Sequence, residues 1–186
     1  MTKPRPHDPP VRVFFALWPD AGECAALAAW LPPLRKLCGG KAMRADTLHA
    51  TLVFLGDVAA HRLEALKLAA EEVGGEPFEL GFDSARYWGH NHIAYAAPSV
   101  MPAPLPQLVL DLEERLRAHR FPFDSRDYKP HVTLLRHAQW RDEPLPEMPE
   151  VAWRVRDFVL VQSLSDDQGA RYEVLARFPL AGPRMI

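Results

Sequence analysis

Short runs of branched and aromatic residues alternate along this chain with stretches in which apolar residues recur every three or four positions. The short runs predict strands and the longer stretches predict helices. Helices are expected between Asp20 and Gly39, over 60–73 and between Pro104 and His119. Strands are expected over 11–18, 47–56, 77–88, 92–97, 131–136, 152–164 and 170–180. This order of elements predicts an α+β fold with largely antiparallel sheets.

The first predicted helix carries clear boundary signals. Asp20 stands at the N-cap position and Glu23 completes a capping-box spacing, while Pro32-Pro33 interrupt the helix before Gly39-Gly40 end it. Residues 1–10 are polar and rich in proline, so they predict a disordered tail. Residues 11–182 hold every predicted element, and we expect them to form a single domain.

Composition narrows the function only slightly. The 186 residues carry a formal net charge of −2, whereas general nucleic-acid binders usually have a clear basic excess. A small RNA end or a nucleotide remains possible as a ligand. No apolar run is long enough to cross a bilayer and no secretory signal pattern is found, so we expect a cytoplasmic protein. Cys24 and Cys38 lack C-x-x-C spacing and predict two small buried thiols.

One short pattern occurs twice, once in each half of the chain. His49-Ala50-Thr51-Leu52 and His131-Val132-Thr133-Leu134 are both His-x-Thr-Leu in a strand-like context. Because side chains alternate across a strand, the histidine and the threonine of each motif share one face. If an approximate two-fold relates the two halves, both pairs can meet across one cleft.

Two histidines and two threonines around one ligand suit phosphoryl transfer. A neutral imidazole can take a proton from the attacking oxygen, and a protonated imidazole can give one to the leaving oxygen. The hydroxyls can donate hydrogen bonds to nonbridging phosphate oxygens. Histidine, with an unperturbed pKa of about 6.5, can serve in both roles near neutral pH.

The chain resembles the RNA 2′,3′-cyclic phosphodiesterases, also described as 2′-5′ RNA ligases, of the 2H phosphoesterase superfamily. The matching features are VFFAL at the start of the fold, LHATLVFLGDV around the first histidine, KPHVTLLRHA around the second, and a closing stretch with Ser163, Gly169 and Tyr172. The resemblance covers about Arg12 to Leu180. It implies a bilobal fold of two pseudo-symmetric lobes, with largely antiparallel sheets facing a central cleft and helices outside.

The resemblance also implies hydrolysis of an RNA or nucleotide 2′,3′-cyclic phosphate to a 2′-phosphate, with no metal and no cofactor. In the family's pattern His49 is the proton donor to the 3′ leaving oxygen and His131 is the proton acceptor that activates water. Thr51 and Thr133 bind the phosphate, and Arg136, from an H-x-T-x-x-R pattern, binds the substrate. Arg136 falls on the opposite face of a regular strand from His131, so a bulge or the strand end is needed to bring it to the cleft.

Other interpretations stay open. The same two histidines could catalyse reversible 2′-5′ RNA ligation, or the fold could bind RNA ends or nucleotides without catalysis, although binding alone needs no acid/base pair. His90 and His92 are spaced like a chelating pair but have no third ligand nearby. Core packing is favoured over base stacking for Phe14 and Phe15. His137 adjoins the second motif as a candidate for tuning it. We expect a monomer with no membrane or protein partner.

Overall fold

The computed structural model describes residues 8–141 and 144–182. Residues 1–7 of the expected tail lie outside this part of the chain, and the first strand begins at Val11 as predicted. The helices are α1 (Ala21–Ala28), α2 (Leu31–Cys38), α3 (Leu63–Glu71) and α4 (Pro104–Ala118), with 3₁₀ turns at Ala45–Thr47 and Ala60–Arg62. The strands are β1 (Val11–Leu17), β2 (Lys41–Ala42), β3 (Ala50–Val58), β4 (Phe78–Phe82), β5 (Ser84–Trp88), β6 (Ile93–Ala97), β7 (Val132–Arg136), β8 (Val151–Val155), β9 (Asp157–Asp166) and β10 (Gly169–Pro179).

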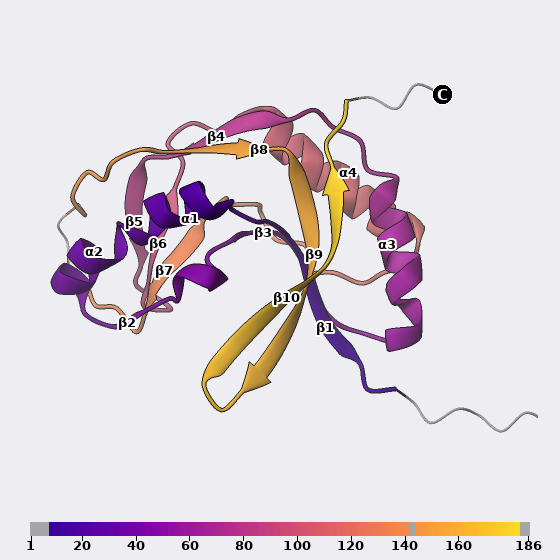
Figure 1. The fold of residues 1–186 in the computed structure, drawn as a ribbon, viewed down its shortest axis with the longest axis horizontal. Coiled ribbons are helices and arrows are strands. Elements are labelled where there is room, and N and C mark those ends of the chain that lie inside the picture. Colours follow the sequence, from indigo (N-terminus) through magenta and orange to yellow (C-terminus); the bar gives the residue numbers. More distant parts are fainter. Residues whose placement is uncertain (1–7, 142–143, 183–186) are drawn as a thin grey trace, which may run out of the picture.

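Two four-stranded sheets form the two lobes. One has the strand order β10-β9-β1-β3 and the other has the order β2-β7-β6-β5, while β4 and β8 pair separately across the top of Figure 1. Every strand pairing in the described residues is antiparallel. Helices α3 and α4 pack on β10 and β3, and α1 and α2 pack on β8 and β7, so helices flank both sheets. The predicted bilobal α+β fold is confirmed.

β1 is buried on both faces, which explains its nearly continuous apolar run. Val13, Phe15 and Leu17 lie in the main core, together with the buried faces of the helices. Phe14 and Ala16 belong to a smaller cluster on the opposite face of the same sheet, with Val159 and Val161 of β9. Because the two sets alternate along β1, this strand forms part of two apolar layers at once. The leucine stripe of α4 lies in the main core, as predicted.

The region after β1 folds through two short helices. The predicted capping box is present: the Asp20 carboxylate accepts the backbone N–H of Glu23, and the Glu23 carboxylate accepts that of Asp20, each at 2.8 Å. Pro32 and Pro33 do more than interrupt a helix, because they lie in the first turn of α2, where a missing N–H costs nothing. No helix in the described ranges is long and apolar enough to cross a membrane.

Two predicted strands are each divided in two, so their assignment as single strands was wrong. The strand expected over 77–88 changes partner at Asp83, whose carboxylate accepts the Ser99 backbone N–H at 2.8 Å; β4 pairs with β8, and β5 pairs with β6. The strand expected over 152–164 changes partner at Arg156, whose carbonyl accepts the Leu180 N–H at 2.8 Å. Apolar residues continue on both sides of each break, so the pattern alone does not reveal the change of sheet.

Candidate active site

His49 and His131 lie at matching places in the two lobes. His49 directly precedes β3 and His131 directly precedes β7, so the prediction that both lie within strands is off by one residue. β3 and β7 contact each other, and the two histidines line the same cleft, which has a volume of about 890 Å³. This volume is near the upper end of the roughly 300–1,000 Å³ range of small-molecule pockets. The structure therefore brings the two motifs together around one ligand-sized space.

Each imidazole is held by a backbone carbonyl two residues earlier. Nδ1 of His49 lies 2.7 Å from the carbonyl oxygen of Thr47, and Nδ1 of His131 lies 2.8 Å from that of Lys129. A carbonyl can only accept a hydrogen bond, so Nδ1 carries a proton in both rings. Nε2 is then the nitrogen that can exchange a proton with a ligand: it accepts in the neutral ring and donates in the protonated ring.

Thr51 and Thr133 line the cleft beside the histidines. Each is two residues after its histidine, and each histidine–threonine pair lines the cleft together, as strand alternation predicts. Neither hydroxyl makes a hydrogen bond to another group within the described residues. Both are partly exposed, so both hydroxyls are available to donate a hydrogen bond to a ligand.

Arg136 also lines the cleft, and a β-bulge accounts for its position. In the pairing of β6 with β7, Tyr95 is opposite Thr133 and Ala94 is opposite Leu135, so Leu134 has no partner on β6. One extra residue reverses the alternation that follows it. Arg136 therefore returns to the face of His131, by one of the two routes that the sequence required.

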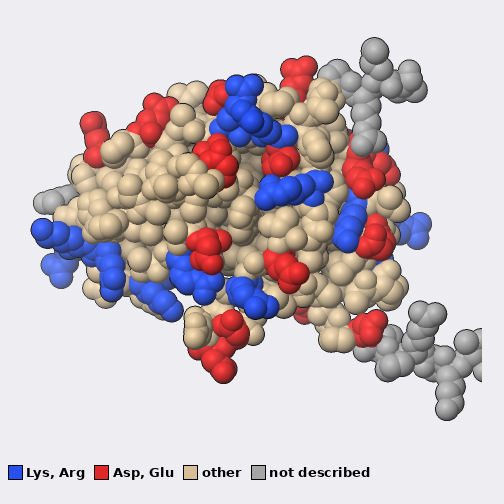
Figure 2. Space-filling model, in the orientation of Figure 1, with Lys and Arg blue, Asp and Glu red and all other residues tan. Residues whose placement is uncertain are grey.

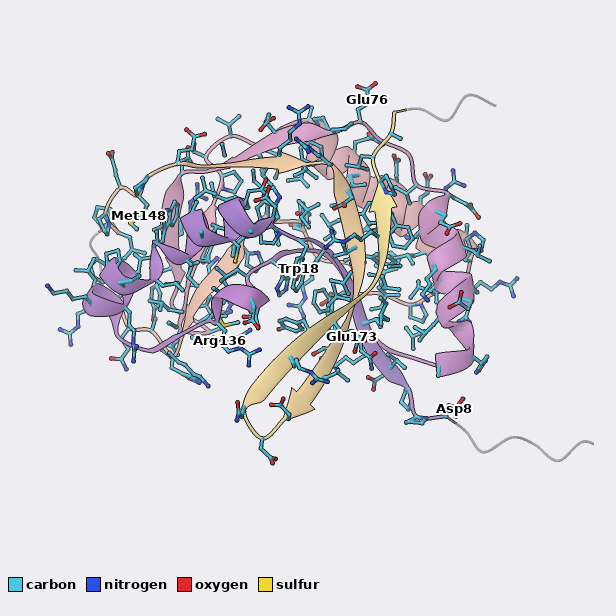
Figure 3. All side chains as sticks on the ribbon, in the orientation of Figure 1. Asp8, Trp18, Glu76, Arg136, Met148 and Glu173 are labelled. Atoms are coloured by element: carbon cyan, nitrogen blue, oxygen red, sulfur yellow. The ribbon has the colours of Figure 1, made fainter. Side chains whose placement is uncertain are left out.

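Aromatic rings surround His49, which the sequence motif did not indicate. Trp18 stacks on the imidazole with ring centroids 5.3 Å apart and an interplanar angle of 9°, and Figure 3 shows Trp18 near the centre of the molecule. Phe14 lies at 5.0 Å, and Tyr172 of β10 presents its edge at 5.1 Å. The alternation along β1 that places Phe15 in the core also places Phe14 on this face.

His131 has a smaller aromatic surround in the other lobe. Trp88 of β5 lies at 4.7 Å in an edge-on arrangement, and Tyr95 of β6 lies at 5.8 Å. These two rings also contact each other, with centroids 3.9 Å apart. Both catalytic candidates are thus enclosed by rings that restrict their orientation and limit their contact with water.

This enclosure changes the acidity of both imidazoles. Burial lowers the pKa of His49 from 6.5 to about 4, with a further lowering from the positive charges of His131 and Arg136; the hydrogen bond to Thr47 opposes it. Burial also lowers the pKa of His131, against the hydrogen bond to Lys129. Both rings are mainly neutral at pH 7 without an anionic ligand. A bound phosphate would raise both pKa values because an opposite charge favours the protonated form.

The remaining histidine candidates differ in their relation to the cleft. His90 lines it, whereas His92 lies with its Nδ1 atom 3.1 Å from the Tyr87 hydroxyl. His137 has a φ of 55° beyond the end of β7 and is not among the described residues that line the cleft. Within the described ranges, no group of three or more histidine, cysteine, aspartate or glutamate side chains could hold a metal ion.

Two lobes that each contribute a His-x-Thr motif to a shared cleft define a 2H phosphoesterase fold. The chain belongs to the 2′-5′ RNA ligase superfamily, whose family model matches residues 24–167.

Several relatives match over nearly the whole chain. The chain is 30% identical to the RNA 2′,3′-cyclic phosphodiesterase of Escherichia coli, over 92% of this chain and 97% of that protein. It is also 30% identical to the enzyme of that name from Thermus thermophilus, over 92% of this chain and 91% of the relative. The crystal structure of E. coli LigT with 3′-AMP superposes with a TM-score of 0.84 at 29% identity, covering 92% of this chain and 99% of LigT. LigT has also been crystallised with ATP and with NADP⁺.

Proposed function

We propose that this chain hydrolyses the 2′,3′-cyclic phosphate of RNA ends or nucleotides to a 2′-phosphate. Water is the attacking group, a P–O bond to the attacking oxygen forms, and the bond from phosphorus to the 3′ oxygen breaks. The products are a 2′-phosphate and a free 3′ hydroxyl. Relatives at 30% identity that carry the name RNA 2′,3′-cyclic phosphodiesterase support this reaction. We expect the enzyme to act in the cytoplasm as a monomer.

In this proposal the two histidines divide the proton transfers. His131, neutral and with Nε2 unprotonated, accepts a proton from the attacking water. His49, protonated, donates a proton from Nε2 to the departing 3′ oxygen. Thr51 and Thr133 donate hydrogen bonds to the nonbridging phosphate oxygens, and the Arg136 guanidinium stabilises the negative charge that grows on the phosphate.

The observation that carries the proposal is the matched pair of Nδ1 contacts to the carbonyls of Thr47 and Lys129. Each contact fixes the ring orientation and the tautomer, which a general acid or base requires. A site that only binds nucleotides needs no such control over Nε2. The cleft position of both rings and both threonines adds to this support.

Turnover of cytidine 2′,3′-cyclic phosphate in EDTA tests the proposal. We expect conversion to cytidine 2′-phosphate by the unaltered protein, and a loss of about 10²–10⁴-fold in kcat for His49→Ala and for His131→Ala. His61→Ala is the matched control, because His61 lies in the 3₁₀ turn before α3 and does not line the cleft. Binding of cytidine 2′-phosphate measured by calorimetry shows whether the inactive variants still have an intact cleft.

Different results separate the alternatives. Activity that survives the loss of either histidine contradicts the acid/base pair, and product binding without any turnover supports a noncatalytic binding module. Dependence on an added metal contradicts the metal-free reaction. Reversible ligation uses the same histidines, with the 5′ hydroxyl of a second RNA in place of water, and is supported if an RNA with a 5′ hydroxyl yields a 2′-5′ linked product.

A further inference from the structure

Lys41 of β2 and Arg136 of β7 stand directly opposite each other in an antiparallel pairing. Side chains opposite each other across two strands project from the same face, with Cβ atoms about 5 Å apart. Two like charges in this arrangement destabilise a sheet. Both side chains are exposed at the sheet edge. Their mutual repulsion is unfavourable in the free protein, and an anionic ligand from solvent can reach both charges.

The backbone fixes this juxtaposition. Gly40, with a φ of +82°, lies so close to β7 that a Cβ atom there would be 2.5 Å from the Arg136 carbonyl oxygen. The pairing continues past Ala42, because the Met43 N–H donates to the Leu134 carbonyl at 2.9 Å. β2 is therefore held against β7 at both of its ends, and Lys41 is held opposite Arg136.

Lys41 lies at the margin of the cleft. Arg136 and Met43 both line the cleft, and Met43 directly follows β2, two residues beyond Lys41, so strand alternation puts Lys41 and Met43 on one face. The Lys41 ammonium group therefore extends the cationic surface of the cleft outward from Arg136. Figure 3 shows Arg136 at the lower left of the molecule, on the side where Figure 1 places β2.

The positive charges of Lys41 and Arg136 at the margin of the cleft are not paired with acidic side chains in the described part of the chain. Neither Lys41 nor Arg136 forms an ion pair within the described residues, whereas Arg126, another cation that lines the cleft, pairs with Asp124. Arg35 and Lys36, exposed in the last turn of α2, are likewise without an ion pair in this part of the chain. Figure 2 shows Lys and Arg side chains gathered at the lower left, where Figure 1 places α2 and β2.

From this arrangement we infer that Lys41 binds the internucleotide phosphate adjacent to the terminal cyclic phosphate, while Arg136 contacts the terminal phosphate itself. The substrate class is then an oligoribonucleotide end rather than a mononucleotide. Arg136 provides a planar fork and Lys41 a compact charge. Because their Cβ atoms lie about 5 Å apart on one face, two successive phosphates of one RNA chain can each meet one of these cations. The inference rests on the proposed cyclic phosphodiesterase activity.

The test compares two substrates with the same reacting end: cytidine 2′,3′-cyclic phosphate, and a synthetic pentaribonucleotide that ends in it. We expect the oligonucleotide to have the higher kcat/KM, and Lys41→Gln to reduce the ratio of the two kcat/KM values about three- to ten-fold. Lys41→Arg should retain the preference. The dependence of log KM on log salt should be steeper for the oligonucleotide, by about 0.7 for each extra phosphate contacted.

Lys67→Gln on α3 is the control, because it also removes one positive charge, at a residue that does not line the cleft. Equal kcat/KM values for the two substrates, or equal ratios for Lys41→Gln and Lys67→Gln, overturn the inference and leave the proposed function standing. Absence of turnover with either substrate overturns the proposed function, and this inference with it.

Discussion

Leu52 and Leu134 occupy equivalent places in the two lobes: each lies three residues after its histidine, and Leu52 has no partner on β1 as Leu134 has none on β6. In β3, Thr51 is opposite Ala16 and Val53 is opposite Phe15, so the extra residue is Leu52. In β7 the corresponding extra residue is Leu134. The internal repeat is therefore a repeat of backbone geometry as well as of His-x-Thr.

These bulges bring the fifth residue after each histidine back to the cleft, and there the lobes differ. Arg136 follows His131, whereas Phe54 follows His49 and has the Arg12 guanidinium 4.8 Å from its ring centroid. One lobe thus presents a cation directly, and the other presents an aromatic ring beneath a cation. This difference gives a nearly symmetric site two chemically distinct sides, as a reaction with distinct attacking and leaving oxygens needs.

Arg136→Gln should lower kcat/KM for cytidine 2′,3′-cyclic phosphate by about 10–100-fold, because a hydrogen bond to a charged phosphate is lost with the guanidinium. Arg136→Lys should recover only part of the loss, since it keeps the charge without the planar fork. Steady-state kinetics measures both. Arg115→Gln, which removes a charge that pairs with Glu72, serves as the control. Equal kinetics for Arg136→Gln and Arg115→Gln would rule out a substrate contact.

The pH profile of kcat/KM should be a bell with its maximum below pH 6.5. The reaction requires one protonated and one neutral histidine, and kcat/KM reports the free enzyme. Burial lowers the pKa of His49 to about 4 and lowers that of His131 below 6.5. Activity therefore falls as pH rises through the higher apparent pKa of the pair and as pH falls below the lower one.

The pH profile of kcat should differ from that of kcat/KM, because kcat reports the bound complex. The phosphate anion favours protonated imidazole, so the kcat bell should lie at higher pH than the kcat/KM bell. Initial rates measured across pH 4 to 9, at saturating and at low substrate concentrations, separate the two profiles. A kcat/KM maximum at or above pH 7 would contradict the lowered pKa values of the two rings.

Trp18→Leu should raise the pKa of His49 from about 4 toward 6.5, because removing the stacked ring admits water to the imidazole. We expect kcat to fall about ten-fold as well, since the imidazole loses a surface that fixes its orientation. NMR titration of the ring protons measures the shift. Trp88→Leu is the matched variant and should act on His131 instead. An unchanged His49 titration in Trp18→Leu would show that the stacking does not control its acidity.

The residues that sequence reasoning found share one property: their signal is local. His49, Thr51 and the capping box of Asp20 are recognised from spacing alone, because a strand repeats every two residues and a helix cap spans three. Trp18 and Tyr172 have no such signal as neighbours of His49. They meet it only because β1 pairs with β9 and β9 with β10, and the register of those pairings is not written in any short segment.

The same limit explains what was missed at the margin of the cleft. β2 has two residues, too few for any alternation to predict a strand, so Lys41 could not be placed opposite Arg136 from the sequence. A bulge was one of two routes by which Arg136 could reach the cleft, and the sequence did not indicate that it would fall at Leu134. The changes of partner at Asp83 and Arg156 likewise depend on distant hydrogen bonds.

Gly40→Ala should destabilise the protein more than Gly39→Ala and should weaken the preference for an oligonucleotide end. Both glycines have positive φ, +82° and +63°, so each alanine adds backbone strain of about 1–3 kcal/mol. Only at Gly40 would a Cβ atom also meet β7, at 2.5 Å from the Arg136 carbonyl oxygen; at Gly39 nothing lies within 4 Å. Urea denaturation compares the free energies of unfolding, and the two-substrate assay compares the kcat/KM ratios. If the two variants match in both measurements, close contact between Gly40 and β7 is not what holds Lys41 opposite Arg136.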